Sequence, residues 1–254
     1  MINITVWNES THKGERGGAY PDGMNAAIKD IFAGRGEYSV TCALLDDPDQ
    51  GLPDDVLNST DVLFWWGHCR HDEVKDELVD KICKRVEAGM GAIFLHSAHY
   101  SKPFRRLMGT SCNLAWREKK GEGERIWITN PFHPIAQGLK EGFRLDGEEM
   151  YGEYFDIPKP DDVIFTGWFS GGEVFRSGCT FTRGQGRIFY SQPGHETFPI
   201  FYNENIRRIL ENAVLWVTKN NSEVITFKPN DDCIHRPVTL ENICPPRGLK
   251  KLFK

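Results

Sequence analysis

The sequence predicts an α/β protein in which parallel strands are covered by helices. Short apolar runs alternate with amphipathic segments along the first half of the chain, a pattern typical of layered α/β domains. The runs at 62–66 and 92–95 are continuously apolar, as expected for strands that are buried on both faces. The order strand, helix, strand, helix, strand favours parallel pairing with right-handed crossovers.

The elements of the first half follow from apolar spacing and from the residues that end helices. We expect strands at residues 2–7, 38–45, 62–66 and 92–95. A helix is predicted to begin near Pro21, because apolar residues recur at helical spacing from Met24 to Ile31 before two glycines. The clearest helix covers 74–86, where five apolar residues share one face and charged residues occupy the other.

Beyond residue 110, strands are predicted to be linked mostly by turns rather than helices. We expect them at residues 125–129, 163–169, 173–181 and 186–191, with a glycine turn joining the last two in a hairpin. A final helix is predicted at 206–217. Residues 219–254 contain four prolines and a basic end, and we expect a solvated extension there. The chain is therefore predicted to form one α/β domain over residues 1–218, followed by this extension.

The composition argues against several classes of partner and cofactor. The 31 basic and 36 acidic residues give a formal net charge of −5, which argues against a nucleic-acid-binding protein. We expect no membrane span and no signal peptide, because no apolar run is long enough and the N-terminus lacks a basic region. Glycine-rich motifs for dinucleotides or phosphates are missing, so no nucleotide cofactor is expected. The seven cysteines are odd in number and have no Cys-x-x-Cys spacing, which predicts reduced thiols in a cytoplasmic protein.

Three of the predicted strand ends are each followed by histidine. Ligands of open α/β sheets bind at the carboxyl ends of the strands, so His68, His99 and His195 are expected to meet there. Neutral imidazole binds zinc, and three histidines with one open position form a known kind of catalytic metal site. These three residues are therefore the predicted ligands of a divalent metal, with zinc as the preferred ion. His71 is expected at the surface near a helix cap, and His96 is expected to point into the sheet.

An acidic segment at 146–158 is the second candidate for chemistry. It mixes carboxylates with Tyr and Phe between Gly and Pro, which is unlike a solvated charged helix. Glu149 and Glu153 are four residues apart, so they would share a helix face or converge in a loop on one ligand. A carboxylate beside a metal or a keto group can act as a general base. The segment is also compatible with a surface loop whose acids have no functional role.

Seven segments of the sequence together resemble one known family. They are Val6–Glu9, Trp65–His68, Leu95–His99, Leu107–Thr110, Glu148–Glu153, Gly172–Gly178 and Pro193–Glu196. In this order they are similar to the trehalose-utilisation (ThuA-like) family, and the resemblance runs over residues 2–218. It implies a flavodoxin-like three-layer sandwich with a mostly parallel central sheet and a β-rich insertion, related to class I glutamine amidotransferases. It also implies a link to disaccharide metabolism.

The implied relation to amidotransferases rests on a few residues. Those enzymes place a nucleophilic cysteine at a strand-to-helix elbow, with His and Glu after a later strand. His195 and Glu196 resemble the later pair, whereas the elbow at 95–99 contains no cysteine. We therefore expect no glutamine hydrolysis. A serine hydrolase that uses Ser97 with His195 stays an alternative, although glycine does not flank this serine on both sides.

Together, these observations predict a metal-assisted enzyme that acts on a keto-sugar or disaccharide derivative by isomerisation, elimination or hydrolysis. The predicted catalytic residues are Glu149, Glu153, His195 and Glu196. The predicted substrate-binding residues are Trp7, Trp66 and Tyr151, which would stack on the sugar, with His133 between two prolines and Ser97. The alternative is a non-catalytic carbohydrate-binding or regulatory module on a degenerate amidotransferase fold. The expected partner is a small-molecule sugar, with no nucleic acid or membrane, and a homo-oligomer is compatible with the sequence.

Overall fold

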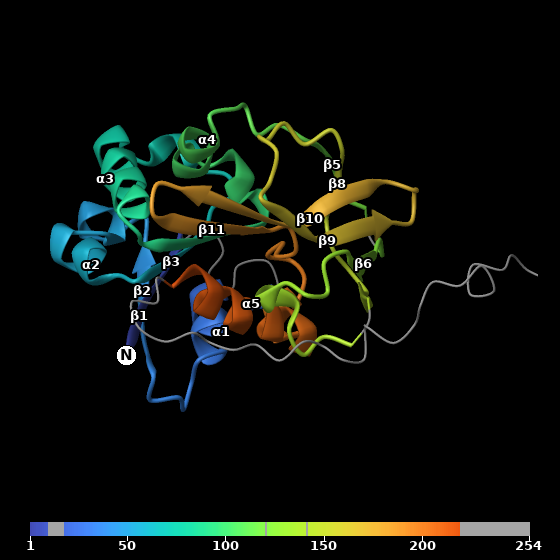
Figure 1. Cartoon of the computed structure of the whole chain (residues 1–254), viewed down its shortest axis with the longest axis horizontal. Helices are drawn as coiled ribbons and strands as arrows, with labels where there is room; N and C mark the ends of the chain where they lie inside the picture. Colours follow the sequence, from blue (N-terminus) through green and yellow to red (C-terminus); the bar gives the residue numbers. More distant parts are fainter. Residues whose placement is uncertain (10–17, 120, 141, 219–254) are drawn as a thin grey trace, which may run out of the picture.

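The computed structural model describes residues 1–9, 18–119, 121–140 and 142–218, and its centre is a nine-stranded sheet between two groups of helices (Figure 1). The strand order is β2-β1-β3-β4-β11-β10-β9-β6-β7. A separate two-stranded sheet is formed by β5 and β8. The prediction of an α/β domain is confirmed, and the extension predicted at 219–254 lies outside the described residues.

Five neighbouring strands form the parallel half of the large sheet. Their bounds are Tyr38–Leu44 (β2), Ile2–Asn8 (β1), Val62–Trp66 (β3), Gly91–Leu95 (β4) and Gly186–Ser191 (β11). β3 and β4 are buried along their whole length, which explains why their sequences are continuous apolar runs. Leu95 at the end of β4 pairs with Trp66 on one side and with Ser191 on the other. The carboxyl ends of β3, β4 and β11 therefore lie side by side.

The other half of the sheet is antiparallel. Its strands are Val174–Arg183 (β10), Asp162–Phe169 (β9), Glu124–Ile128 (β6) and Phe143–Leu145 (β7). The predicted hairpin joins β10 to β11, and its Gly184 has a φ of +58°, a conformation that glycine adopts without steric cost. In the small sheet, Ala115–Arg117 (β5) runs antiparallel to Met150–Gly152 (β8).

Helices cover both faces of the sheet and complete three layers (Figure 1). One face carries Met24–Asp30 (α1) and Glu204–Val217 (α5), and the other carries Asp54–Ser59 (α2), Asp76–Glu87 (α3) and Lys102–Met108 (α4). Single 3₁₀ turns are Pro48–Gly51 (η1), His71–Glu73 (η2), His96–Tyr100 (η3), Pro134–Ala136 (η4) and Ile200–Tyr202 (η5). Within the described ranges, every helix is too short or too polar to cross a membrane.

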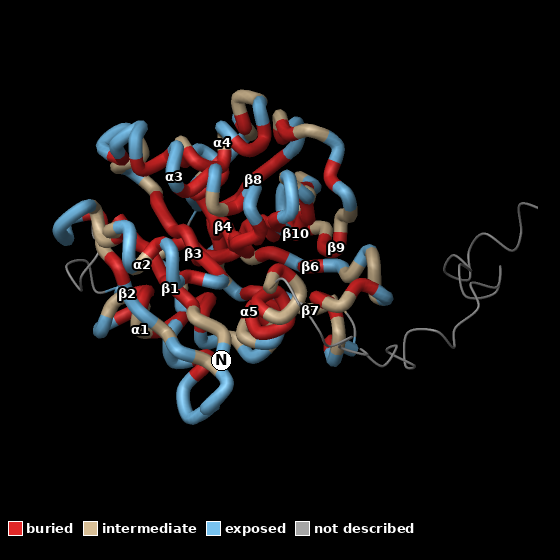
Figure 2. Tube along the Cα trace, turned by 60° about the vertical axis from the view of Figure 1, so that its left-hand side comes forward, coloured by how far each residue is buried: buried red, intermediate tan, exposed pale blue. Residues whose placement is uncertain are grey.

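Alternate residues of the central strands divide the core between the two faces. Phe64 and Ile93 pack with the helices α1 and α5, whereas Leu63 and Phe94 pack with α2, α3 and α4. This division follows from strand geometry, in which successive side chains point to opposite faces. Figure 2 shows that the buried part of the trace is concentrated on these central strands.

Two helices begin at side-chain caps that the sequence supplies. The Asn203 side chain accepts hydrogen bonds from the backbone N–H groups of Asn205 and Ile206 at the start of α5. Ser101 does the same for Phe104 at the start of α4, where Pro103 fits because an early helical position needs no N–H donor. These caps fix where the chain turns from the strand ends back along the sheet.

Most elements match their predicted positions, and five short ones were not predicted. The four strands expected beyond residue 110 are present as β6, β9, β10 and β11, each end within two residues of its expected place. The helix expected from Val74 starts at Asp76, because Val74 is an extended residue that is buried just before the helix. The sequence did not predict α2, α4, β5, β7 or β8, each of which has seven residues or fewer.

We predict that Gly186→Ala destabilises the fold through a backbone clash. A Cβ at this position would overlap the carbonyl oxygen of Val86, at the end of α3, and neither backbone can move without disturbing β11. The expected loss is about 1–3 kcal/mol in the free energy of unfolding, measured by urea denaturation. Gly36→Ala is the matched control, because it faces open space at an ordinary φ and should change stability by less than about 0.5 kcal/mol. Equal stability of the two variants would contradict this prediction.

Candidate functional site

Three histidine rings meet where the parallel strands end. His68 follows β3, His96 follows β4, and His195 follows β11 by four residues. The ring centroids lie 6.0 Å apart for His68 and His96, 5.3 Å for His68 and His195, and 5.2 Å for His96 and His195. The adjacent pairing of the three strands accounts for this convergence.

Two of these histidines and one carboxylate form a candidate metal centre. Within the described residues, possible ligand atoms of His68, Glu149 and His195 all lie within 4.8 Å of one another. His195 and Glu149 are buried, and His68 is partly exposed. Glu149 comes directly before β8, a strand of the small two-stranded sheet. Two nitrogen donors and one oxygen donor at this spacing can bind a divalent ion and leave a position open for a further ligand.

The buried carboxylate of Glu148 holds the two ligand-bearing segments together. One oxygen accepts the N–H of Gly194 at 2.8 Å, and the other accepts the N–H of Glu149 at 2.8 Å and of His195 at 3.3 Å. Burial raises the pKa of Glu148 to about 7, against the charge of His96 and these hydrogen bonds. A single side chain therefore fixes the backbone positions of Glu149 and His195 relative to each other.

The buried ring of His96 contacts the Glu149 carboxylate. His96 is fully buried, and its φ of +53° turns the chain sharply as it leaves β4. Its Nδ1 lies 2.9 Å from the Gln192 carbonyl, its Nε2 lies 3.0 Å from Glu149 Oε2, and its ring stacks on Tyr151. Burial would lower the pKa of His96, but the hydrogen bond to Glu149 and the charge of Glu148 raise it. The pKa of Glu149 is lowered by His96 although burial opposes this shift, so Glu149 is an ionised carboxylate.

Each candidate imidazole ligand has a partner that orients its ring. Nδ1 of His68 lies 3.1 Å from a carboxylate oxygen of Glu196, and Nδ1 of His195 lies 2.9 Å from the hydroxyl of Thr197. Burial would raise the pKa of Glu196, but the hydrogen bond with His68 lowers it to about 2. Burial, helped by the charge of His96, lowers the pKa of His195 to about 4, so this ring is neutral at pH 7. A carboxylate partner such as Glu196 orients metal-binding histidines in proteins. Nδ1 of His195 also accepts the backbone N–H of Thr197.

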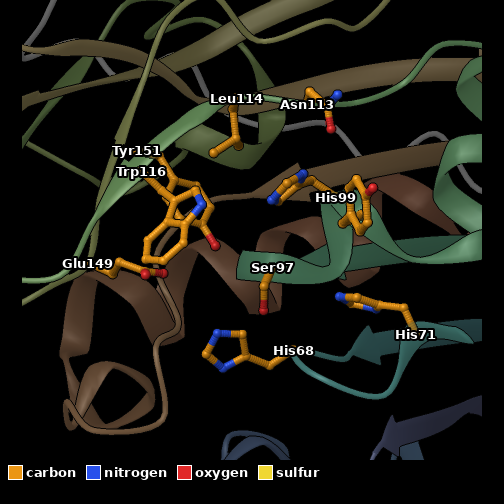
Figure 3. A pocket seen from close by; sticks show the side chains of 10 residues that line it. His68, His71, Ser97, His99, Asn113, Leu114, Trp116, Glu149 and Tyr151 are labelled. Atoms are coloured by element: carbon orange, nitrogen blue, oxygen red, sulfur yellow. The ribbon is translucent and has the colours of Figure 1, made fainter.

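A cavity of about 340 Å³ opens beside this centre (Figure 3). Its lining residues are His68, His71, Ser97, His99, Tyr100, Asn113, Leu114, Trp116, Glu149 and Tyr151. In Figure 3, Trp116 and Tyr151 lie together on one side, with His71 and His99 on the other. The size is at the lower end of the range of small-molecule sites, which run from roughly 300 to 1,000 Å³.

His99 lines this cavity but does not belong to the candidate donor set. Its Nδ1 lies 2.7 Å from the carbonyl of Cys112, so the ring donates there and leaves Nε2 as an acceptor. Burial lowers the pKa of His99 to about 3, which keeps the ring neutral. The structure thus places the predicted ligand His99 beside the cavity, and Glu149 completes the donor set with His68 and His195.

Several other predicted residues also lie at or next to the cavity. Ser97 and Tyr151 line it, and Glu196 pairs with His68 at its edge. Ser97 Oγ donates to the carbonyl of Gly67 at 2.8 Å, so its proton is directed to the backbone rather than to a base. Trp66 is buried behind His68, and its Nε1–H donates to the Gly194 carbonyl, which gives it a supporting rather than a stacking position.

Three predicted residues lie elsewhere. Glu153 binds the Arg176 guanidinium and the N–H of Phe155, which satisfies its carboxylate away from the histidines. Trp7 is buried and stacks on Trp65 with centroids 3.7 Å apart, so its ring faces are not available to a sugar. His133 begins η4 and packs against a tryptophan of α5. The sequence could not separate these cases because each residue type and local context also fits a binding role.

Four residues of the site were not predicted from the sequence. His96 was expected to point into the sheet, but the chain leaves the strand at this residue and strand alternation ends there. His71 was expected at the surface and instead lines the cavity. Glu148 adjoins the predicted Glu149, and only the structure shows which of the two carries the backbone hydrogen bonds. Trp116 lies on a strand of three residues that has no periodic signal.

Comparisons with known proteins agree with the resemblance seen in the sequence. The family model for ThuA, described as trehalose utilisation, matches residues 3–217. A ThuA-like protein from Parabacteroides merdae is similar in structure, with a TM-score of 0.62 and 16% identity, over 88% of this chain and 92% of that one. For a ThuA-like protein from Bacteroides uniformis the TM-score is 0.61 and the identity 16%, over 85% of this chain and 91% of that one.

A cytoplasmic protein from Salmonella typhimurium is also similar, with a TM-score of 0.57 and 13% identity, over 86% of this chain and 100% of that one. At these identities, the likeness to solved structures shows the fold alone. No curated protein matches the sequence.

We predict that His133 makes the stability of the fold depend on pH. Burial lowers its pKa from 6.5 to about 4, and its Nδ1 accepts the N–H of Ile135. A histidine whose pKa is lower in the folded state stabilises the fold above pH 6.5, and this contribution is lost as the pH falls toward 4. Between pH 7.5 and pH 5, the wild type should lose on the order of 2 kcal/mol more unfolding free energy than His133→Asn.

Urea denaturation of both proteins at the two pH values measures this difference. Asparagine keeps an oxygen acceptor for the Ile135 N–H and does not titrate, so the variant isolates the effect of protonation. Parallel losses of stability in the wild type and the variant would show that His133 does not carry the effect.

Proposed function

The chain belongs to the ThuA (trehalose utilisation) family, and from this premise we propose that it is a metal-assisted enzyme of sugar metabolism. The proposed substrate is a keto-sugar or an oxidised disaccharide derivative, and the proposed reaction is isomerisation, elimination or hydrolysis. The observation that carries this proposal is the convergence of His68, Glu149 and His195 beside a cavity of about 340 Å³, in which His68 and Glu149 form part of the wall.

The residues fit a zinc ion as the proposed metal. Two imidazoles with one carboxylate form a donor set that catalytic zinc accepts, and one position stays open for substrate or water. The fit is supported by the partners of the donors, since Glu196 orients His68, Thr197 orients His195, and His96 holds Glu149 ionised.

The side chains of the cavity have distinct roles in this proposal. A bound zinc ion would polarise the carbonyl group of the sugar. Glu149 has two roles, since it completes the donor set and is the carboxylate of the cavity wall that can accept a proton from the carbon beside the carbonyl. Return of that proton to the former carbonyl carbon, together with transfer of the neighbouring hydroxyl proton to the former carbonyl oxygen, completes an isomerisation. Departure of a group from the next carbon with its bonding electron pair completes an elimination instead. His99 Nε2 accepts a hydrogen bond from a sugar hydroxyl, because Nδ1 donates to Cys112.

We also propose the finer fold assignment, a flavodoxin-like sandwich related to class I glutamine amidotransferases. The parallel half has the order β2-β1-β3-β4-β11, and this is the flavodoxin order with β11 as the fifth strand. In this assignment β5 to β10 form an insertion between β4 and β11. His96 stands at the strand end with positive φ, where a nucleophile elbow would place its nucleophile. With histidine rather than cysteine there, glutamine hydrolysis is not proposed.

A cytoplasmic location is part of the proposal. Each of the five cysteines in the described part of the chain is a free thiol. Free thiols are typical of a reducing compartment.

We predict that the protein binds about one zinc ion per chain. His195→Ala removes a ligand, so it should lower the zinc affinity by more than the roughly 10–100-fold that is lost with an orienting partner. Glu196→Gln should show that smaller, 10–100-fold effect because it weakens only the orientation of His68. The control is His99→Ala, which changes the same cavity but no member of the donor set. Zinc content after dialysis and a competition titration measure all four proteins.

Two results would overturn the metal-assisted function. One is a wild type without bound zinc and without zinc-dependent turnover of keto-sugars. The other is unchanged zinc affinity in His195→Ala. Sugar binding that persists without zinc would then favour the alternative of a non-catalytic carbohydrate-binding module.

A further inference from the structure

An exposed tryptophan stands at the outer side of the cavity. Trp116 lines the cavity and yet is 66% exposed, whereas Trp7, Trp65 and Trp66 are almost fully buried. A large apolar ring that stays exposed beside a pocket favours ligand binding, because a ligand that covers the ring removes its apolar surface from water. Trp116 is therefore available for stacking, in contrast to the tryptophans that the sequence suggested.

The small sheet fixes Trp116 relative to the inner site. Trp116 on β5 is the direct pairing partner of Tyr151 on β8, and residues opposite each other in an antiparallel pair project from the same face. Tyr151 in turn stacks on His96, beside the candidate donor set. Figure 3 shows Trp116 next to Tyr151, and Leu114 and Asn113 continue around the cavity. The order from inside to outside is thus the donor set, then Tyr151, then Trp116.

The outer lining is neutral and combines aromatic with amide groups. It consists of Tyr100, Asn113, Leu114 and Trp116. Arg117, the neighbour of Trp116, is paired with Glu122 and Glu173 and so brings no net positive charge to the lining. An indole face packs against the C–H face of a pyranose, and an amide can donate to and accept from its hydroxyls. These aromatic and amide groups suit a neutral sugar ring, whereas a phosphorylated ring would need a cationic partner, for which the candidate is Arg105, whose guanidinium lies over the Tyr100 ring.

We propose that Trp116 forms an outer subsite that binds the second, non-reacting ring of a disaccharide or glycoside. This inference rests on the proposed function, because the inner ring is the one that reaches His68, Glu149 and His195. The outer subsite makes the protein select a two-ring substrate over a single sugar of the same type. Trp116 is a specificity residue in this proposal, since it touches substrate but not the reacting atoms.

The test compares the affinities of zinc-loaded protein for trehalose and for glucose, measured by calorimetric titration. Trp116→Ala should weaken trehalose binding about tenfold and change glucose binding less than about twofold, since the loss is confined to the second ring. Trp116→Phe should recover part of the trehalose affinity, because it restores an aromatic face. Trp168→Ala is the matched control, a 46% exposed tryptophan on β9 that does not line the cavity, and it should change neither affinity.

Four outcomes overturn the subsite. Equal losses for the two sugars would assign Trp116 to the ring that reacts, and unchanged trehalose binding would remove it from recognition altogether. Tighter binding of trehalose 6-phosphate than of trehalose would show an anion site instead of a neutral subsite, and a wild type that binds neither sugar would contradict the proposal directly. Zinc content is measured on the same samples. Selective loss of trehalose binding in a protein without zinc would sustain the subsite while contradicting the metal-assisted function.

Discussion

The arrangement of the site depends on one buried carboxylate. Glu148 accepts backbone N–H groups from its own neighbour and from the loop after β11, two segments that are more than forty residues apart in the chain. A buried carboxylate needs such partners, because leaving it without them would cost several kcal/mol. Each segment therefore requires the other, and the positions of Glu149 and His195 are set together rather than separately.

The parallel sheet supplies the other constraint. Strands that pair in register end at the same level, so whatever follows β3, β4 and β11 must share one edge. This is why the sequence could predict both the α/β fold and the meeting of histidines from its apolar runs and the residues after them. His68 and His195 meet as expected, since their place depends only on strand order and strand ends.

The remaining features depend on contacts that local patterns do not encode. Periodicity marks Trp7 as part of a strand but does not say that Trp65 covers its face. The choice of Glu149 over Glu153 rests on Arg176, which lies on β10 and competes for the second carboxylate. Trp116 is placed by three pairs of residues between short strands, a signal too small to read from the sequence. The sequence thus identifies which segments meet, and long-range pairing decides which side chains face the cavity.

The position of β11 has a wider consequence. The chain leaves the parallel sheet after β4 and returns to it in β11, which is the adjacent strand. The segment between the two strands therefore leaves the parallel sheet and returns to it at adjacent positions. The outer wall of the cavity belongs to this segment. His68 and His195 lie outside this segment, whereas Glu149 lies within it together with the outer wall. A change in the segment therefore alters the oxygen donor and the cavity wall together, while the two imidazoles keep their places at the strand ends.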